Sequence, residues 1–449
     1  MKKLLSNLFI IFILTCIILL SYGFLQNKLK SFKPRDIYHF FVGGNSSDNT
    51  PEDSSDFLDD PDEYRAVWLT YIEFNAYRTS VKTNNEKNFT RFYQHVLDRC
   101  KALHINHIIV QVRPFADALY RSDYYPWAEC ISGKQGQDPG YDPLEVMVRL
   151  THENHMKIEA WINPYRISSG EDIHELADNN QARRWAENQA ESRNVLKYDH
   201  ALYYNPASKQ VRNLIFNGVE EIVEGYRIDG IHMDDYFYPE FDETDFDKAF
   251  DAPEYLSGLK EGKVSRNMSL ADWRRYNINQ LVSGIYKRVH KKNPSLTFGI
   301  SPAGEPEMLR SNLAYYADID TWVSKKGYID YIMPQIYWGY TNKEAPFNDI
   351  INEWKKLCSG SSVKLYAGLQ LYRLGITDKS QSDYKELQTA DVTKKQLKQV
   401  SKDKKVDGFS LFSFQYLDAE NDEYHFESSE YSNLRKNILK DVCSYIENK

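Results

Sequence analysis

Short runs of β-branched and aromatic residues alternate with helix-period segments along most of the chain. Eight runs have the length and composition of strands, at residues 66–71, 105–112, 157–162, 230–234, 296–301, 331–336, 363–370 and 408–414. Amphipathic stretches that predict helices lie between or after them, at residues 89–103, 143–156, 211–226, 273–290, 347–358, 392–400 and 431–447. Eight strand–helix units in tandem are typical of a (β/α)8 TIM-type barrel.

The spacing of the predicted strands indicates where the barrel is elaborated. The ends of the third and fourth strands, Asn163 and Asp234, are 71 positions apart, and Asp234 is 67 positions from Ser301 at the end of the fifth. A strand, a helix and two loops need about 30 to 40 residues, so we expect enlarged loops after strands three and four. The structural alternative, a doubly wound sheet, would usually carry a Gly-rich loop after its first strand, and residues 66–74 contain no glycine.

The N-terminus has a different pattern. Residues 4–25 form a nearly unbroken apolar run of 22 residues, which at about 1.5 Å per residue spans a bilayer core of about 30 Å. A cleaved signal peptide, the alternative, would have a shorter apolar core and a small-residue cleavage site. We therefore expect residues 1–27 to be a transmembrane signal anchor, residues 28–62 a flexible acidic tether, and residues 63–449 the barrel domain.

Composition narrows the class of protein. Of 449 residues, 42% are hydrophobic and 27% charged, as in an ordinary globular protein, and the net charge of −8 argues against a nucleic-acid binder. The five cysteines are scattered without a C-x-x-C pair, which argues against a disulfide scaffold or a zinc knuckle. We expect the four cysteines of the barrel domain to be buried as small apolar side chains. A single disulfide between two of them is the alternative. Aromatic residues make up 14% of the chain, more than a core requires.

Polar and aromatic residues gather at the predicted C-terminal ends of the strands, where barrels of this type carry their active sites. The candidates for substrate binding are Thr70, Glu73, Gln111, Arg113, Trp161, Asn163, Tyr165, Arg166, His232, Tyr236, Gln335, Tyr337, Trp338, Gln370 and Tyr372. The arginines suit a carboxylate or the orientation of a catalytic acid, the amides suit sugar hydroxyls, and the aromatic rings suit the faces of pyranose rings.

The fourth strand carries the densest candidate chemistry. Its side chains alternate, so His232 and Asp234 share one face, and the apolar residues between them predict that this face points toward the barrel axis. Asp234 is the candidate nucleophile or base, with Asp235 as a weaker alternative; either aspartate could instead cap the following loop. Glu305, after the fifth strand, is the candidate acid, and Glu73 a weaker one.

Six stretches in one order resemble a known family, the bacterial family-10-like glycosyl hydrolase domain. They lie at residues 65–70, 111–120, 160–166, 229–239, 299–302 and 331–338. The resemblance implies a (β/α)8 barrel on the extracytoplasmic side of the cell membrane that cleaves peptidoglycan glycan strands stripped of their stem peptides. It further implies cell-wall or division machinery as partners. The acid residue is not fixed by any of these stretches.

Two other functions remain open at this stage. A barrel that only binds glycans would keep the aromatic surfaces without an acid and base pair. A metal-dependent polysaccharide deacetylase would use the His232, Asp234 and Asp235 cluster, although no second histidine pair supports it. We expect neither a metal nor a cofactor.

Overall fold

A computed structural model describes residues 63–241, 250–419, 421, 423–424 and 433–449. The predicted anchor and tether, residues 1–62, lie outside this range. Among the described helices, none is both long enough and apolar enough to cross a membrane. The four cysteines from Cys100 onward are free; Cys100, Cys130 and Cys443 are buried, and Cys358 is partly buried.

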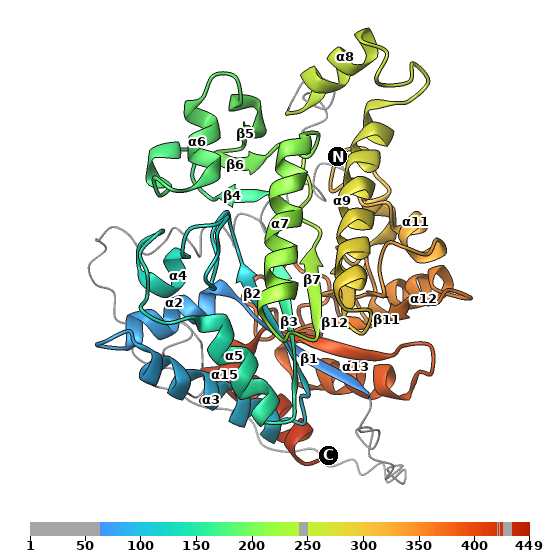
Figure 1. Ribbon diagram of the computed structural model, residues 1–449. Helices are drawn as coiled ribbons and strands as arrows, with labels where there is room; N and C mark the ends of the chain where they lie inside the picture. Colours follow the sequence, from blue (N-terminus) through green and yellow to red (C-terminus); the bar gives the residue numbers. More distant parts are fainter. Residues whose placement is uncertain (1–62, 242–249, 420, 422, 425–432) are drawn as a thin grey trace, which may run out of the picture. The chain divides into compact units, whose positions relative to one another are not determined.

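The core of the fold is a parallel sheet of ten strand segments (Figure 1). They are β1 (Tyr64–Leu69), β2 (His107–Arg113), β3 (Lys157–Ile162), β7 (Gly230–Asp234), β8 (Thr297–Ser301), β9 (Tyr331–Ile332), β10 (Gln335–Ile336), β11 (Lys364–Leu365), β12 (Ala367–Gln370) and β13 (Gly408–Phe412). Every one overlaps a predicted strand, although β1 begins two residues before the prediction and β2 ends one residue after it. The sixth predicted strand is interrupted at Pro334, which has no N–H for the ladder, and the seventh at Tyr366.

The pairing order makes the sheet TIM-barrel-like. Strands pair in the order β10-β12-β13-β1-β2-β3-β7-β8-β9-β11. Since β9 and β10 belong to one chain segment, and β11 and β12 to the next, the two ends of this order come from the same pair of segments. The inside is filled by side chains that include Ala66, Trp68, Ile109, Trp161 and Met333.

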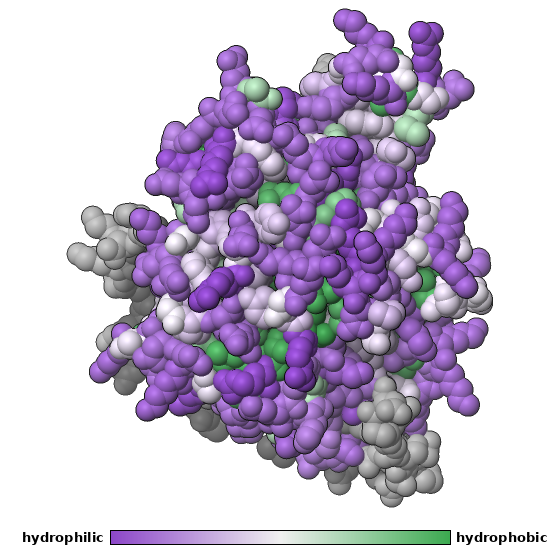
Figure 2. Space-filling model, viewed as in Figure 1, coloured by the Kyte–Doolittle hydropathy of each residue, from purple (hydrophilic) through white to green (hydrophobic). Residues whose placement is uncertain are grey.

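Helices surround the sheet. They are α2 (Tyr71–Ser80), α3 (Glu86–Ala102), α4 (Glu129–Ser132), α5 (Pro143–Glu153), α7 (Lys209–Gly225), α9 (Leu270–Lys292), α10 (Pro306–Leu309), α11 (Ile319–Ser324), α12 (Phe347–Leu357), η3 (Glu386–Gln388), α13 (Asp391–Lys402), α14 (Phe414–Leu417) and α15 (Asn433–Glu447). Helices α7 and α9 pack side by side, and the outer surface they help to form is hydrophilic, with apolar residues showing only in small patches (Figures 1 and 2). This matches the amphipathic patterns in the sequence.

The two long loops fall where the spacing predicts them. After β3 the chain forms a small antiparallel sheet, β4 (Arg166–Ser168), β5 (Val195–Tyr198) and β6 (Ala201–Tyr204), with η1 (Ile173–Glu175), α6 (Gln181–Glu187) and η2 (Ser192–Asn194). After β7 it forms α8 (Ala252–Lys260). Both insertions stand at the same end of the molecule, at the top of Figure 1. They follow strand ends, so they border the predicted active-site end.

Candidate active site

Asp234 is the last residue of β7, and its carboxylate is held by side chains from β3 and the loop that follows it. Oδ2 accepts hydrogen bonds from Trp161 Nε1 at 3.0 Å and from Asn163 Nδ2 at 3.4 Å, and Oδ1 accepts one from the Tyr236 backbone N–H at 3.3 Å. Burial raises the pKa of Asp234 to about 7, although these donors and the Arg166 guanidinium hold it down. A rigid carboxylate that titrates near neutral pH suits a base or nucleophile.

Asp235 has a different environment from Asp234. Its Oδ2 accepts a hydrogen bond of 2.5 Å from the backbone N–H of Ala303, in the loop after β8. Burial and, to a smaller extent, the neighbouring Asp234 charge raise the pKa of Asp235 to about 7, against the opposing hydrogen bond from Ala303. Asp235 therefore orders the loop that carries Glu305. This is a different loop from the one after β7, which the sequence-based alternative had Asp235 cap.

Two further carboxyl groups, Glu305 and Glu240, lie in this neighbourhood. Both are half-buried; burial raises the pKa of Glu305, and burial raises the pKa of Glu240 to about 7. Burial also raises the pKa of the Tyr315 hydroxyl, and the charges of Asp235, Glu240 and Glu305 add to the effect, so one phenol lies within electrostatic range of all three. A carboxyl that keeps its proton near neutral pH is what a general acid requires.

Glu240 is absent from the sequence-based candidates. It lies five residues after Asp235 and directly after Pro239, at the end of the densest motif. Its nearness to that motif was the available signal, but no spacing rule for loops distinguishes it from other loop acids.

Aromatic side chains from three strand ends lie together beside these acids. The ring of Tyr337 is 5.6 Å from that of Tyr372, in an edge-on arrangement, and 5.8 Å from that of Phe412. Burial raises the pKa of the Tyr337 hydroxyl, and charges on Tyr372, Tyr236 and Asp235 contribute. Tyr236, Tyr337 and Tyr372 are all partly exposed. The structure thus groups three of the predicted ring surfaces near Asp235.

The predicted amides and Trp338 have mixed surroundings. Gln335 Nε2 donates to the backbone oxygen of Ser301 at 2.9 Å, so its amide bridges two strand ends. Gln370 is 1% exposed, and both atoms of its amide lack a partner within the described residues. Trp338 packs on the Glu305 loop: a Cβ built on Gly304 would lie 2.5 Å from its ring, so only glycine fits there.

Three of the predicted substrate contacts, Thr70, Glu73 and Gln111, lie at the start of α2 and make hydrogen bonds there. Thr70 is the N-cap; its Oγ1 accepts from Ile72 N at 3.1 Å, and Glu73 Oε2 accepts from Thr70 N at 2.9 Å, which makes a capping box. Gln111 Oε1 accepts from the Tyr71 N–H at 3.2 Å. The structure therefore gives these three predicted substrate contacts a structural role.

Arg113 lies between β2 and α7, and Tyr165 lies in the main hydrophobic core, which corrects their assignment to the cleft. The β2–β3 register shifts between Gln111 and Arg113, so these two residues, assigned to the cleft by their shared position at a strand end, lie in different environments. Arg113 is fully buried, 3.8 Å from the ring centroid of Tyr125, and a Cβ on Gly218 of α7 would lie 2.9 Å from its Nη1. Tyr165 is fully buried in the main hydrophobic core.

His232 is fully buried, and both of its ring nitrogens face other side chains of the interior. Its Nε2 accepts from Trp68 Nε1 at 3.3 Å, and its Nδ1 is 2.7 Å from the Tyr331 hydroxyl. Burial lowers the pKa of His232 to about 3, so the ring is neutral. With both ring nitrogens occupied, His232 is not available as a ligand in the His-x-Asp-Asp metal set that the sequence suggested.

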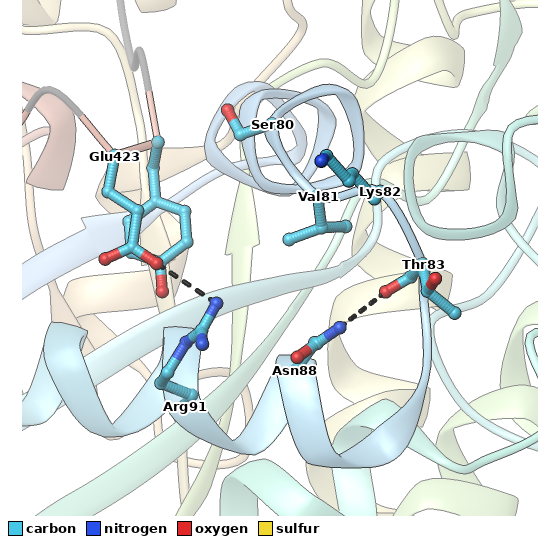
Figure 3. Close-up of a pocket in the computed structure, with 8 residues that line it drawn as sticks. Ser80, Val81, Lys82, Thr83, Asn88, Arg91 and Glu423 are labelled. Atoms are coloured by element: carbon cyan, nitrogen blue, oxygen red, sulfur yellow. Dashed lines mark hydrogen bonds and ion pairs between the residues drawn. The ribbon is translucent and has the colours of Figure 1, made fainter.

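A separate pocket of about 280 Å³ lies where α2 leads into α3 (Figure 3). It is lined by Ser80, Val81, Lys82, Thr83, Asn88, Arg91, Glu423 and Tyr424. None of these is a candidate for catalysis, and its ion pair, Arg91 with Glu423 at 3.1 Å, is more than half exposed. We therefore place the candidate chemistry at the strand ends and not in this pocket.

A TIM-barrel-like sheet with carboxyl groups and aromatic rings at its strand ends defines the class of glycosidase-type barrels. Residues 63–386 match the family Glycosyl hydrolase-like 10, and the chain belongs to this family. The resemblance inferred from the six sequence stretches is confirmed.

Two curated relatives and one solved structure illustrate the match. The chain is 36% identical over 330 residues to glycosyl hydrolase YngK of Bacillus subtilis (strain 168), covering 70% of this chain but only 61% of YngK. It is 30% identical over 379 residues to glycosyl hydrolase DigH of Escherichia coli (strain K12), covering 79% of this chain and 83% of DigH. The PgaB (BpsB) glycoside hydrolase domain from Bordetella bronchiseptica shares the fold, with a TM-score of 0.52, 12% identity, and coverage of 85% of this chain and 98% of that one.

Proposed function

We propose that the chain is a glycoside hydrolase that cleaves cell-envelope polysaccharide, and that its substrate is peptidoglycan glycan strands from which the stem peptides have been removed. The observation that carries this proposal is the buried Asp234 carboxylate, fixed by Trp161 and Asn163 beside half-buried acids with raised pKa values. The names of the relatives, both glycosyl hydrolases, support the reaction class.

In this proposal two carboxyl groups share the work. Asp234 acts as nucleophile or base, and Glu305 acts as the acid that protonates the leaving oxygen. Glu240 competes with Glu305 for the role of acid, because its pKa is also raised by burial. Tyr236, Tyr337 and Tyr372 supply surfaces for sugar rings.

The proposal also covers location and architecture. Residues 1–27 anchor the protein in the cell membrane, and residues 28–62 tether a closed (β/α)8 barrel on the extracytoplasmic side, within reach of cell-wall or division machinery. The apolar run at residues 4–25 supports the anchor. Protease accessibility of the barrel in intact cells tests this part.

The reaction is tested by mass spectrometry of products. The full-length protein, purified in mild detergent, is incubated with glycan strands that carry or lack stem peptides. We expect new reducing ends from the stripped strands with the wild type and none with Asp234→Asn. Strands that remain intact but are retained by the wild-type protein would refute hydrolysis in favour of a glycan-binding barrel.

The acid is assigned by comparing Glu305→Gln with Glu240→Gln. Loss of a general acid costs about 10² to 10⁴-fold in rate on the natural glycan, but much less on an aryl glycoside whose leaving group needs no proton. We expect this pattern for Glu305→Gln. If only Glu240→Gln shows it, Glu240 is the acid.

A further inference from the structure

Arg166 is the first residue of β4 and stands next to the catalytic carboxylate. Its backbone N–H donates to Asn163 Oδ1 at 3.0 Å, and Asn163 in turn donates to Asp234. The guanidinium carbon lies 5.1 Å from the ring centroid of Phe115 and 5.8 Å from that of Tyr236. The side chain is half-buried, so part of it faces the solvent that a substrate would displace.

The guanidinium of Arg166 makes no hydrogen bond or ion pair with any residue that the structure describes. Other enclosed arginines of this chain are paired: Arg274 Nε is 2.8 Å from Asp251 Oδ1, and Arg373 Nη2 is 2.9 Å from Asp383 Oδ1. Arg113 also lacks partners, but it is fully buried between β2 and α7 and no ligand reaches it. Arg166 thus combines unused donors with an open side.

The five N–H donors of a guanidinium form a planar fork that binds the two oxygens of a carboxylate or a phosphate in a bidentate way, and the carboxylate is the one of these that a stripped glycan strand carries. The two aromatic rings exclude water from the flanks of the guanidinium and so strengthen its interaction with an anion. The positive charge of Arg166 acts on neighbouring groups: it lowers the pKa of Asp234 and the pKa values of the Tyr71, Tyr203 and Tyr236 hydroxyls.

We propose that Arg166 is a specificity-determining residue that binds a carboxylate carried by a sugar next to the scissile bond. This proposal rests on the proposed hydrolysis of glycans and narrows the substrate to an anionic one. A strand whose stem peptides have been removed exposes a free carboxylate on a side chain of every second sugar, whereas an attached peptide converts that carboxylate to a neutral amide. A uronic acid polymer offers the same group directly on the ring.

The test compares two forms of one substrate with the full-length protein. Stripped strands are assayed as they are and after chemical reduction of their carboxylates to alcohols. We expect the wild type to lose about 10- to 100-fold in kcat/KM on the reduced strands, mostly through KM. Arg166→Gln should show the same loss on the carboxylate strands and no further loss on the reduced ones, with Arg166→Lys intermediate. Arg149→Gln, an exposed position on α5, is the matched control.

The possible outcomes separate this proposal from the proposed function. If Arg166→Gln lowers activity equally on both forms, or if the wild type does not discriminate, Arg166 does not read a carboxylate. An equal loss together with an acid limb of the pH profile that moves upward would mean that Arg166 only keeps Asp234 ionised. Cleavage of polyglucuronic acid in preference to stripped strands would assign a ring carboxylate instead of a side-chain one.

Hydrolysis itself can fail without deciding the role of Arg166. If the wild type cleaves neither form, the proposed function is wrong, and binding titrations of the same strands then decide. Tighter binding of the carboxylate form by the wild type, lost in Arg166→Gln, supports the carboxylate site; equal binding of both forms overturns it.

Discussion

His232 and Asp234 lie on the same face of β7, two residues apart, yet they belong to two polar layers with opposite designs. The layer around His232 is closed: Trp68 donates to His232, His232 contacts the Tyr331 hydroxyl, and Tyr331 donates to Glu159. In the layer around Asp234, the carboxylate is held, but the half-buried Arg166 guanidinium lacks a hydrogen-bond partner within the described part of the chain. A layer that fills a barrel satisfies itself, whereas a layer that meets a substrate leaves groups unused.

The closed layer also has a fixed direction. An indole N–H can only donate, so His232 Nε2 must accept, and the ring proton therefore sits on Nδ1 and points to Tyr331. Tyr331 then uses its own proton toward Glu159, which also accepts from the Tyr64 hydroxyl at 2.9 Å. The donors of Trp68, His232, Tyr331 and Tyr64 each have an acceptor within this layer, so the layer stabilises the fold and leaves none of these donors for a ligand.

The largest expected effects come from a pair of variants that separates the two layers. Asp234→Asn should reduce kcat on stripped glycan strands by about 10³-fold while lowering the urea midpoint only slightly. The amide oxygen can still accept from Trp161 and Asn163, and only the Tyr236 N–H loses its acceptor. His232→Leu should cost about 2 to 4 kcal/mol of unfolding free energy, because it leaves the Trp68 N–H and the Tyr331 hydroxyl without their partner. Activity per folded molecule should stay within a few-fold of wild type.

The opposite pattern would overturn the division into layers. If folded His232→Leu protein loses activity as completely as Asp234→Asn, then His232 acts on the substrate, and the layer around His232 is part of the site. Circular dichroism and single-temperature kinetics on the same samples distinguish the cases.

Glu159 provides the next largest effect, on the pH dependence of stability. Burial raises its pKa from 4.5 to about 7, against the opposing hydrogen bonds from Tyr331 and Tyr64. A folded-state pKa above the unfolded value gives stability that is complete below about pH 4.5 and is lost as pH rises through 7. The wild type should therefore lose about 3 kcal/mol from this group alone over that window. In Glu159→Gln this loss should disappear, which urea unfolding at pH 4.5 and 8 measures; equal pH slopes in both proteins would contradict it.

Much of this architecture was predictable from the sequence, and the misses have physical reasons. Period-two alternation correctly put His232 and Asp234 on one face. A strand advances only about 3.3 Å per residue, however, and no sequence pattern tells at which residue along β7 the filled interior ends and the site begins. The side of the sheet that Arg113 faces depends on a bulge between Gln111 and Arg113. Pro114 follows directly, but a proline after a strand marks only where the strand ends and does not tell which way the last side chain turns. The antiparallel strands β4, β5 and β6 have three to four residues each, too few for a periodic signal.

One miss was avoidable. Thr70 followed three residues later by Glu73 is the sequence signature of a capping box, and the structure forms both of its hydrogen bonds. The position of these residues at a strand end favoured a substrate contact, but in a barrel the same position also begins the next helix. A polar residue at a strand end can therefore either contact a substrate or cap the helix that follows.

Trp161 and Trp68 allow a finer comparison of the layers, because each donates an indole N–H to a group on β7. Trp161 donates to Asp234 and holds its pKa down, so Trp161→Phe should raise that pKa above 7 and move the acid limb of kcat/KM upward by about one pH unit. Trp68→Phe removes a donor from His232 instead, and the limb should not move. A shift in both variants would mean that the two layers titrate together.

The smallest expected effect tests the reassignment of Thr70. Thr70→Ala removes the oxygen that accepts from the Ile72 N–H and should cost about 1 kcal/mol of unfolding free energy, whereas Thr70→Ser keeps that oxygen and most of the stability. Neither variant should change KM, because Thr70 is 2% exposed and its hydroxyl is occupied by Glu73. If KM for glycan strands rises in Thr70→Ala while the urea midpoint stays constant, the layer around Asp234 extends to β1. The capping box is then part of the binding surface.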